Sequence, residues 1–510
     1  MELLTPKEMQ QVDYQAINRL QIPGILLMEH AAHQVFSYLK EHFDGKSIYI
    51  VCGPGNNGGD GLAIARQLAM WTNCKMTVLM AADASKLTED GMTYFTICKN
   101  IGIDLVQLTE ANEDKLLEQM FLADVIVDAL FGTGLTRPVM GKYKRIIEAV
   151  NQANRKIISV DIPSGIDGLT GQIQGVCVKA DVTITFVRPK LGLYLYPAIE
   201  YTGEVRVVKI GIPEELVKEI DVSTFSIEKE DMQKLLPVRP IRSNKGSFGK
   251  VMTIGGSLGM SGAIALTSMA AYKVGCGTVT TVVPKCILEI MQQKLTEAMA
   301  IGLEDSNGFF SKSAANTLKT LLPNFHVVAM GPGIGRNKDV LQMLTEVLAS
   351  DKPCVIDADG LYFISQVTEL LKARRAPTII TPHPGEMARL VGVSIDDILN
   401  NPLKYAKEFA IKFNTITVLK LEKTVIADTS GVIYINRYGN SGLAKGGSGD
   451  TLTGIITGLL AQHVEPIEAA KLGVYLQTRS ADIAKDILSE YSLMPSDVIH
   501  FLSKAFLELT

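Results

Sequence analysis

Short apolar strands that end in loops rich in glycine and aspartate recur along this chain, and this pattern constrains its fold more than any other feature. In the first part of the chain, strands are predicted over residues 47–51, 75–80, 124–128, 156–160 and 182–187. Helical patterns separate the first of these strands, and amphipathic helices are predicted over residues 25–43 and 62–70. Strands that alternate with helices indicate a mostly parallel α/β sheet.

A second series of strands follows further along the chain. These strands are predicted over residues 250–254, 279–283, 327–330, 354–357, 378–381 and 417–419. A charged junction with several prolines, residues 212–245, separates the two series. A chain of 510 residues has room for roughly two to four domains. We therefore predict two α/β domains, residues 1–215 and residues 216–510.

The charge balance and the cysteines argue against several kinds of protein. Lys plus Arg number 50 and Asp plus Glu number 54, without a basic block, so nucleic acid is not expected as a partner. The seven cysteines are scattered and form no Cys-x-x-Cys pair, which favours reduced thiols in the cytoplasm. The acidic start with Pro6 is not typical of a signal peptide, and no apolar run approaches the length of a membrane span.

One glycine-rich segment late in the chain has the residues of an anion-binding loop. Gly446, Gly447, Ser448 and Gly449 precede Asp450 and a predicted helix. Small residues let the backbone approach a phosphate, and the amides at a helix N-terminus favour negative charge. Asp450 would lie beside that charge, where a carboxylate can take a proton from a hydroxyl. By itself, the segment fits a glycine turn with an aspartate cap equally well.

A second glycine-rich loop follows the first predicted strand. Residues 53–58 match G-x-G-x-x-G, so a dinucleotide-binding dehydrogenase is one alternative. That fingerprint expects an acidic residue about 20 positions further on, at the end of the next strand, whereas Asp83 comes late here. The loop also holds Asn56, Asn57 and Asp60, whose oxygens suit a hard cation or a ribose.

Aspartates follow several other strands. Asp128 and Asp161 lie at the ends of apolar strands and precede loops that contain glycine. Because the carboxyl ends of parallel strands share one edge of a sheet, these two and Asp60 together indicate a binding site there. In the second series, Asp357 ends a strand, and His383 lies between two prolines that hold its backbone rigid. His383 either faces a ligand or bonds to a neighbouring backbone group.

Taken in order, these motifs resemble those of the bifunctional NAD(P)H-hydrate repair enzymes, and the resemblance covers nearly the whole chain. Proteins of that family join a Rossmann-like epimerase domain to a ribokinase-like dehydratase domain that uses ADP or ATP. In the first domain, the matching segments are residues 27–32, 56–60, 127–134 and 161–165. In the second domain, they are residues 245–249, 255–257, 261–263, 331–335, 357–359, 381–386 and 446–450.

The resemblance implies a site for the hydrated dinucleotide in the first domain. The residues that would bind it are Asn56, Asn57, Gly58, Gly59, Asp60, Gly132, Thr133, Gly134, Leu135, Thr136, Arg137, Pro138, Tyr143 and Asp161. Asn57, Asp128 and Ser164 would ligate a potassium ion, and Asp161 is the candidate acid for reversible loss of the C6 oxygen. His30 stands where the family usually has Asn, and Ala32 where it has Gly, which leaves the role of the first helix open.

In the second domain, the resemblance implies a site for the hydrate beside a site for the nucleotide. Ala263, Gly335, His383 and Asp450 would contact the hydrate. The residues that would hold the adenine nucleotide are Lys420, Leu421, Glu422, Lys423, Thr424 and Gly449. Asn244 replaces a usual His, and Leu421 replaces a usual Gly. The branched side chain of Leu421 could crowd the nucleotide.

The chemistry that the resemblance implies explains these residue types. The hydrate carries a hydroxyl at C6 of the reduced nicotinamide ring, and hydroxide is a poor leaving group. Asp450 would deprotonate this hydroxyl, and transfer of a phosphoryl group from ADP or ATP, with magnesium offsetting charge on the phosphates, would turn it into a phosphate. The ring nitrogen would expel the phosphate and restore NADH or NADPH from the S epimer. The first domain would interconvert the R and S epimers.

The resemblance favours ADP as the phosphoryl donor. It also favours a homo-oligomer in the cytoplasm, with neither nucleic acid nor a membrane as a partner.

Two other functions remain open. A ribokinase-like small-molecule kinase explains residues 446–450 but leaves the first domain without a role. A non-enzymatic nucleotide-binding scaffold, such as the epimerase-like domains of messenger RNA decapping scaffolds, predicts loss of the acidic loop residues, whereas Asp60, Asp128 and Asp161 are present.

Overall fold

The computed structural model describes residues 1–71 and 73–510, and its contacts divide the chain into two compact units. The first unit is Glu2–Thr224, and the second is Phe225–Thr510 together with Met1. Each unit has its own parallel or mostly parallel sheet, so the predicted two-domain α/β fold is confirmed. Among the described residues, no helix is both long and apolar enough to cross a membrane.

The first unit is a seven-stranded sheet in the order β3-β2-β1-β4-β5-β6-β7, and every neighbouring pair is parallel. Its strands are β1 (Ser47–Cys52), β2 (Lys75–Met80), β3 (Leu105–Gln107), β4 (Val125–Ala129), β5 (Lys156–Val160), β6 (Val182–Phe186) and β7 (Glu204–Val208). Its helices are α1 (Pro6–Asn18), α2 (Gly24–Phe43), α3 (Asn56–Trp71), α4 (Glu89–Asn100), α5 (Glu113–Gln119), α6 (Lys142–Gln152) and α7 (Glu214–Lys218).

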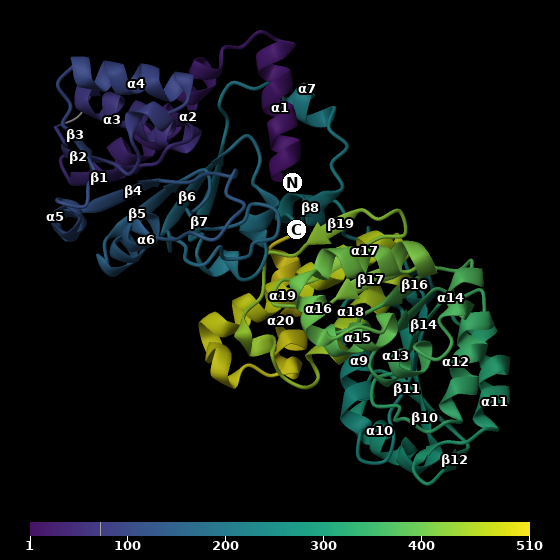
Figure 1. The fold of residues 1–510 in the computed structure, drawn as a ribbon. Coiled ribbons are helices and arrows are strands. Elements are labelled where there is room, and N and C mark those ends of the chain that lie inside the picture. The colour runs from purple at the N-terminus through teal and green to yellow at the C-terminus, as the bar shows by residue number, and fades with distance from the viewer. Residues whose placement is uncertain (72) are drawn as a thin grey trace. The chain divides into compact units, whose positions relative to one another are not determined.

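Helices cover both faces of this sheet (Figure 1). Because side chains alternate along a strand, Ile48 and Ile50 of β1 pack into one core with α2, α3 and α4. Tyr49 and Val51 pack into the other core with α5 and α6. Leu216 of α7 also lies in the first of these cores. The first unit therefore extends to residue 224, a short way beyond the predicted boundary at residue 215.

Helix α3 begins earlier than the sequence pattern suggested. The prediction of a glycine loop followed by a helix from Leu62 is wrong, because the helix begins at Asn56. Glycine inside a helix usually weakens it, but here the glycines let α3 approach the sheet closely. A Cβ atom on Gly58 would lie 1.9 Å from the carbonyl oxygen of Gly53, and one on Gly61 would lie 2.8 Å from Ala129 Cβ.

The second unit contains a ten-stranded sheet in the order β11-β10-β9-β14-β15-β16-β17-β18-β19-β8 and a separate pair, β12 with β13. Its strands are β8 (Thr224–Ser226), β9 (Lys250–Ile254), β10 (Thr278–Pro284), β11 (Met299–Leu303), β12 (Asp305–Ser306), β13 (Phe309–Phe310), β14 (Val327–Met330), β15 (Cys354–Ile356), β16 (Thr378–Ile380), β17 (Ile416–Leu419), β18 (Val425–Ala427) and β19 (Ile433–Ile435). Parallel pairing ends at β17, which continues into antiparallel β18 and β19.

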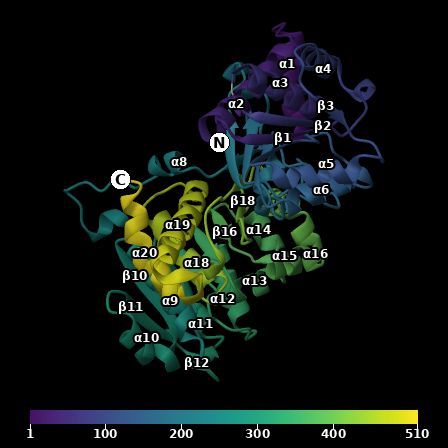
Figure 2. The same cartoon turned by 90° about the vertical axis from the view of Figure 1, so that its left-hand side faces the viewer.

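The helices of the second unit form layers against this sheet. They are α8 (Lys229–Gln233), α9 (Ser261–Lys273), α10 (Leu288–Lys294), α11 (Ala314–Leu321), α12 (Val340–Ala349), α13 (Asp359–Ile364), α14 (Glu369–Ala373), α15 (Pro384–Val391), α16 (Ile395–Asn400), α17 (Pro402–Phe413), α18 (Ser448–Ala461), α19 (Pro466–Ser492) and α20 (Pro495–Leu507). Helices α9, α18, α19 and α20 pack around one core, and Figure 2 shows them grouped together.

Two glycines allow α18 to lie directly on α9. A Cβ atom on Gly454 would lie 2.1 Å from the carbonyl oxygen of Thr267, and one on Gly458 would lie 2.4 Å from that of Ala271. Larger residues would separate the two helices. This close contact fixes the start of α18, which carries Asp450, at the carboxyl edge of the parallel strands.

Candidate active sites

A cavity of about 1060 Å³ lies at the carboxyl edge of the first sheet, where the loops after β1, β4 and β5 meet. Among the predicted site residues, those that line it are Asn56, Asn57, Asp60, Gly132, Thr133, Gly134, Leu135, Thr136, Arg137, Pro138, Tyr143 and Asp161. Gly58 and Gly59 do not line it, because they lie on the buried side of α3, where a Cβ atom on Gly59 would meet Met28. The structure thus brings together almost the whole predicted set.

Asp161 lies in this cavity with a strained backbone and a buried cationic partner. Its φ angle is 67°, a left-handed conformation that is uncommon for a residue other than glycine. Its Oδ1 atom accepts hydrogen bonds from Thr185 Oγ1 at 3.1 Å and from the amide of Phe186 at 3.3 Å, and it also pairs with Lys190 Nζ. Three donors on one oxygen leave the Oδ2 atom of Asp161 available to a ligand.

Lys190 is a site residue that the sequence pattern did not predict. Only 2% of its side chain is exposed, and its ammonium also donates to Thr185 Oγ1 and to the carbonyl oxygen of Phe186. A buried lysine is rare unless it is paired. The available signal was its position, next to Arg188 and Pro189, between the apolar residues 186–187 and 191–195.

Two further carboxyl groups line the same cavity. Burial raises the pKa of Asp60 well above its usual range, and the negative charge of Asp161 raises it further. Burial also raises the pKa of Asp13, on α1, to about 6, against the opposing effect of Lys190. Within residues 1–71 and 73–510, neither carboxyl has a hydrogen-bond partner or an ion pair. The cavity therefore holds acids with raised pKa beside the Asp161–Lys190 pair.

The three residues predicted to bind potassium come together behind this cavity. Ser164 Oγ lies 2.5 Å from Asp128 Oδ1, and Asn57 Nδ2 lies 2.9 Å from the carbonyl oxygen of Phe131. Ser164 Oγ also lies 3.2 Å from that carbonyl oxygen. Carboxylate, hydroxyl and carbonyl oxygens are the ligands that hard cations prefer. Among the described residues, no cluster of three or more His, Cys, Asp or Glu suits a transition metal.

In the second unit, the predicted anion-binding loop does open a helix. Gly447 is the N-cap of α18 with φ 102°, and a Cβ atom there would lie 2.8 Å from Leu266 Cδ1, so both space and backbone require glycine. Gln477 Nε2 holds the loop by donating to the carbonyl oxygen of Ser448 at 2.5 Å. The first amides of α18 have no carbonyl partner within the helix and can bind an anion.

Asp450 shares this helix start with a buried pair. Lys420 Nζ donates to Asp357 Oδ1 at 2.7 Å, and Thr453 Oγ1 donates to Asp357 Oδ2 at 2.8 Å. A Cβ atom on Gly449 would lie 3.0 Å from Lys420 Nζ, so the ammonium lies directly beside the anion-binding loop. The positive charge and the helix amides converge on one place, where a phosphate fits.

The carboxyl groups around Lys420 have different pKa shifts. Burial raises the pKa of Asp450 to about 6, the charge of Asp357 adds to this, and Lys420 opposes it. Burial raises the pKa of Glu386 to about 7, although Lys420, whose Nζ lies 3.9 Å from its Oε2, lowers it. The charge of Lys420 holds the pKa of Asp357 below its usual value despite burial. Asp450 is thus poised to exchange a proton near neutral pH.

His383 caps α15 and so bonds to a neighbouring backbone group, which is one of the two roles that the sequence left open. Its Nδ1 atom accepts from the amide of Gly385 at 3.0 Å, while the ring remains more than half exposed. Burial and the nearby Lys420 lower the pKa of His383, so the ring is neutral near pH 7. The capping bond occupies one ring nitrogen and leaves Nε2, 3.5 Å from Glu386 Oε1, facing the site.

The remaining predicted residues lie on two loops and at the start of one helix. Gly335, with φ 76°, follows β14, and a Cβ atom on it would lie 2.4 Å from Phe309. Ala263 lies in the first turn of α9, beside Gly333. The Lys420–Thr424 turn joins β17 to β18, and within it Lys423 Nζ donates to the carbonyl oxygen of Arg437 at 2.6 Å. Leu421 in that turn is partly exposed.

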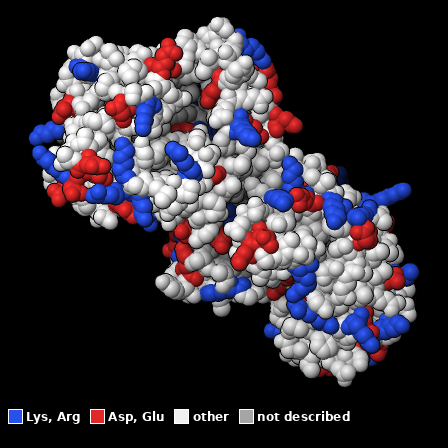
Figure 3. Space-filling model, in the orientation of Figure 1, with Lys and Arg blue, Asp and Glu red and all other residues white. Residues whose placement is uncertain are grey.

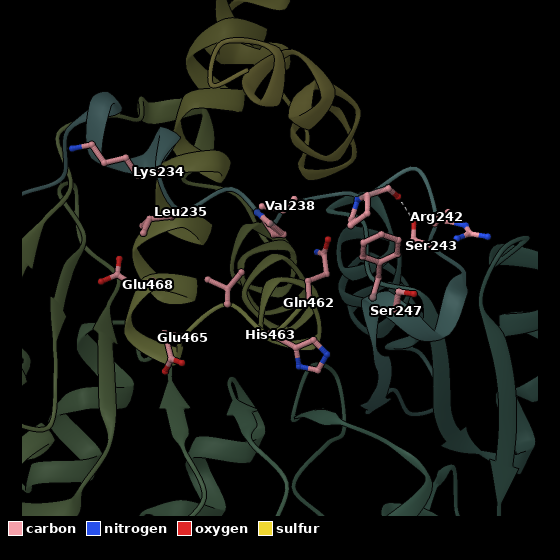
Figure 4. Close-up of a pocket in the computed structure, with 14 residues that line it drawn as sticks. Lys234, Leu235, Val238, Arg242, Ser243, Ser247, Gln462, His463, Glu465 and Glu468 are labelled. Carbon is pink, nitrogen blue, oxygen red and sulfur yellow. Dashed lines mark hydrogen bonds between the residues drawn. The ribbon is translucent and has the colours of Figure 1, made fainter.

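Another cavity of the second unit contains none of the predicted residues. It has a volume of about 520 Å³ and is lined by nine residues between Lys234 and Phe248, by residues 462–465 between α18 and α19, and by Glu468 of α19 (Figure 4). It lies at the C-terminal end of α18, whereas Asp450 lies at the N-terminal end. A helix of 14 residues is about 20 Å long, so the cavity is far from Asp450.

Charges on the molecular surface are mixed rather than segregated. On the face shown in Figure 3, Lys and Arg side chains alternate with Asp and Glu, without a broad area of one sign. An extended basic surface is the usual mark of nucleic-acid binding.

Comparisons with known proteins find relatives of both units. The family model described as YjeF-related protein N-terminus matches residues 24–192, and that of NAD(P)H-hydrate dehydratase matches residues 251–503. The bifunctional NAD(P)H-hydrate repair enzyme Nnr of Moorella thermoacetica is 38% identical over 509 residues, with 98% of this chain and 96% of that protein covered. The enzyme of the same name from Thermofilum pendens is 36% identical, with 99% and 96% covered.

A solved structure resembles the second unit. The ADP/ATP-dependent NAD(P)H-hydrate dehydratase of Bacillus subtilis, co-crystallized with ATP and Mg²⁺, is 30% identical with a TM-score of 0.50. The match covers 56% of this chain and 99% of that protein.

Proposed function

Since the chain belongs to the family of bifunctional NAD(P)H-hydrate repair enzymes, we propose that its two strand-end sites act in series on the C6 epimers of hydrated NADH and NADPH. The first unit carries the epimerase domain and the second the dehydratase domain. The epimerase site is the cavity around Asp161, and the dehydratase site is the start of α18 around Asp450. We infer domains of residues 1–215 and 216–510, and the contact boundary at residue 224 lies close to this division.

In the epimerase site, the hydrated ring would lie against Asp161. Loss of the C6 oxygen leaves a cationic, iminium-like ring, which the Asp161 carboxylate stabilises through its charge. Residues 56–60 and 132–138 and Tyr143 hold the rest of the dinucleotide. Water that adds again at C6 gives either epimer, and a site that binds both makes the exchange reversible.

In the dehydratase site, the start of α18 and Lys420 would bind the terminal phosphate of the donor. Asp450 takes the proton from the C6 hydroxyl, whose oxygen attacks that phosphate, and Ala263, Gly335 and His383 hold the ring. The ring nitrogen lone pair then expels phosphate, and loss of a proton from C5 to solvent restores the C5=C6 double bond, so that NADH or NADPH, AMP or ADP and phosphate are the products. Magnesium, when bound, would offset charge on the phosphates, and Asp357 and Glu386, the carboxyl groups beside Lys420, would hold it.

One observation carries the dehydratase assignment. The Asp450 carboxyl, with a pKa raised to about 6, lies at the same helix start as the Lys420 ammonium. A base and an anion site side by side are what phosphoryl transfer to a hydroxyl needs. The adenine would lie over the Lys420–Thr424 turn, and Gly449 would contact the phosphates.

A mixture of both hydrate epimers tests the whole proposal. With Mg²⁺ and ADP, the wild-type chain is expected to restore the full near-ultraviolet absorbance of NADH in one continuous course, and the same assay with ATP compares the two donors. Rapid recovery of about half the material followed by a slow phase would contradict an active epimerase. No recovery with either nucleotide would contradict the repair function and favour a small-molecule kinase.

Potassium removal gives a second test. We propose that the oxygens of Asn57, Asp128 and Ser164 bind K⁺ and so fix the loops that hold the substrate. Exchange of K⁺ for tetramethylammonium is expected to slow the epimerase about tenfold or more, since misplacement of a substrate by about 1 Å can cost about 10²-fold. The dehydration of the S epimer serves as the internal control. Equal epimerase rates in both salts would contradict the potassium site.

We further propose a cytoplasmic homo-oligomer that prefers ADP as the donor. The cysteines that the structure describes are all free thiols, which suits a reducing compartment. Sedimentation of the purified chain at several concentrations measures the oligomeric state directly.

A further inference from the structure

We propose that Asp13, on helix α1, is a second catalytic carboxyl of the epimerase, and that Asp13 and Asp161 act as an acid and a base on the two faces of the hydrated ring. This inference rests on the proposed epimerase function. It assigns a chemical role to a residue that lies before residues 24–192, the segment that the family model of the first domain matches.

Helix α1 is held firmly beside the cavity. Thr5 caps the helix and forms a reciprocal pair of hydrogen bonds with Glu8. The segment just before the helix pairs with the one that carries Lys190, because the amide of Leu4 donates to the carbonyl oxygen of Pro189 and the amide of Leu191 donates to that of Leu4. Asp13 therefore has a fixed position in the cavity that Asp161 also lines.

The surroundings of Asp13 give it no structural task. Among the described residues, its carboxyl has neither a hydrogen bond nor an ion pair. The charged groups that face it are Asp60 from α3, Asp161 after β5 and Lys190, and Asp90 of α4 also lines the cavity. A partly buried carboxyl without a partner usually lowers stability, so its presence in a binding cavity points to a use in chemistry.

The reaction itself requires proton transfer on two faces. Inversion at C6 removes the oxygen from one face of the ring and adds it to the other. When the protonated Asp13 gives its proton to the C6 hydroxyl, the C6–O bond breaks, water leaves and the ring nitrogen lone pair forms the C=N bond of the cation. A water on the other face then forms the new C6–O bond and gives a proton to the Asp161 carboxylate. The two carboxyls share one proton throughout, and exchange with solvent restores the starting state. In the reverse direction, Asp161 is the acid, the role predicted for it from the sequence, and Asp13 is the base.

The electrostatics match this division of roles. Burial raises the pKa of Asp13 to about 6, so about one carboxyl in ten still holds a proton at pH 7 and half do at pH 6. Asp161 accepts hydrogen bonds from the Lys190 ammonium and from two neutral donors, so a positive charge lies beside its carboxyl group. An acid and a base on opposite sides of one carbon also occur in inverting glycosidases.

The substitution Asp13→Asn tests the role of Asp13 in the full-length chain. With mixed epimers, ADP and Mg²⁺, the rapid recovery of the S epimer is expected to match that of the wild type, while epimerisation falls about 10²-fold. Asp13→Glu keeps a carboxyl and is expected to restore part of this rate. Asp104→Asn, at an exposed position of the same unit, is the control for the loss of one charge.

The pH profile separates catalysis from a structural role. The acid must be protonated to act, so wild-type epimerisation is expected to fall as the pH rises through about 6, the pKa of Asp13. Epimerisation by the Asp13→Asn variant within about twofold of the wild type would overturn the proposal. If that variant fails to fold, a wild-type profile without this decline would overturn it. A wild-type chain that never converts the R epimer would overturn both this role and the proposed epimerase.

Discussion

Replacement of Asp450 by asparagine is expected to lower kcat for dehydration of the S epimer by about 10²–10⁴-fold, the usual contribution of a general base. An amide cannot accept the proton of the C6 hydroxyl, so the oxygen remains a poor nucleophile toward the donor phosphate. The KM for ADP is expected to change little, because the α18 amides and Lys420 still bind the phosphate. Initial rates of NADH recovery over a range of ADP concentrations measure both constants.

The pH dependence belongs to the same prediction. Asp450 must be ionised to act, so the wild-type rate is expected to fall as the pH drops through about 6. The folded-state pKa lies above the unfolded value, so any stability that Asp450 contributes is present at low pH and is lost as the pH rises through about 6. Asp450→Asn should therefore be no less stable than the wild type at neutral pH, and thermal unfolding checks this.

The exposed Asp396 of α16 supplies the control for this substitution. Asp396→Asn removes the same charge from the same unit, far from any predicted site residue in sequence, and is expected to leave dehydration unchanged. An Asp450→Asn chain that dehydrates the S epimer at the wild-type rate would contradict the assignment of the base.

Replacement of Asp161 by asparagine is expected to lower the epimerase rate by about 10³–10⁴-fold, because it removes both a proton acceptor and the charge that stabilises the cationic ring. The rapid recovery of about half of a mixed hydrate sample should remain, and the second half should follow only at the uncatalysed rate. Measured absorbance courses with the wild type and the variant show this difference directly.

Two controls accompany this variant. Asp161→Asn leaves the Lys190 ammonium buried without its carboxylate, so the first unit is also expected to lose stability. The dehydratase activity of the same chain reports on the second unit, and near-ultraviolet circular dichroism reports on folding. Asp104→Asn provides the matched loss of charge. An Asp161→Asn chain that remains folded and epimerises at the wild-type rate would contradict the role of Asp161.

The sequence predicted the framework of both sites because that information is local. Apolar runs such as residues 47–51 specify strands, and the loops that follow them must meet at one edge of a parallel sheet. This rule by itself predicts that Asp60, Asp128 and Asp161 lie close together. The same rule puts Asp357 at the carboxyl edge of the second sheet, where it accepts a hydrogen bond from Thr453 of α18, the helix that carries Asp450.

What the sequence did not reveal depends on contacts between distant segments. Lys190 pairs with Asp161 through tertiary packing, and Asp13 reaches the cavity only because α1 docks beside the segment of Lys190. The start of α3 at Asn56 was also missed, because glycines usually end helices. Here glycines are favoured inside the helix, because it packs closely on Ala129 and Gly53. The short antiparallel strands β18 and β19 were not predicted either.

The most direct test combines two variants, each of which is inactive at one of the two sites. Asp450→Asn alone is expected to restore almost no NADH from mixed hydrate epimers, and Asp161→Asn alone is expected to stop at about half. An equal mixture of the two variants, with ADP and Mg²⁺, should restore all of the NADH, because each supplies the working site that the other lacks. Recovery that still stops at about half in the mixture would contradict the claim that one cavity epimerises what the other site dehydrates.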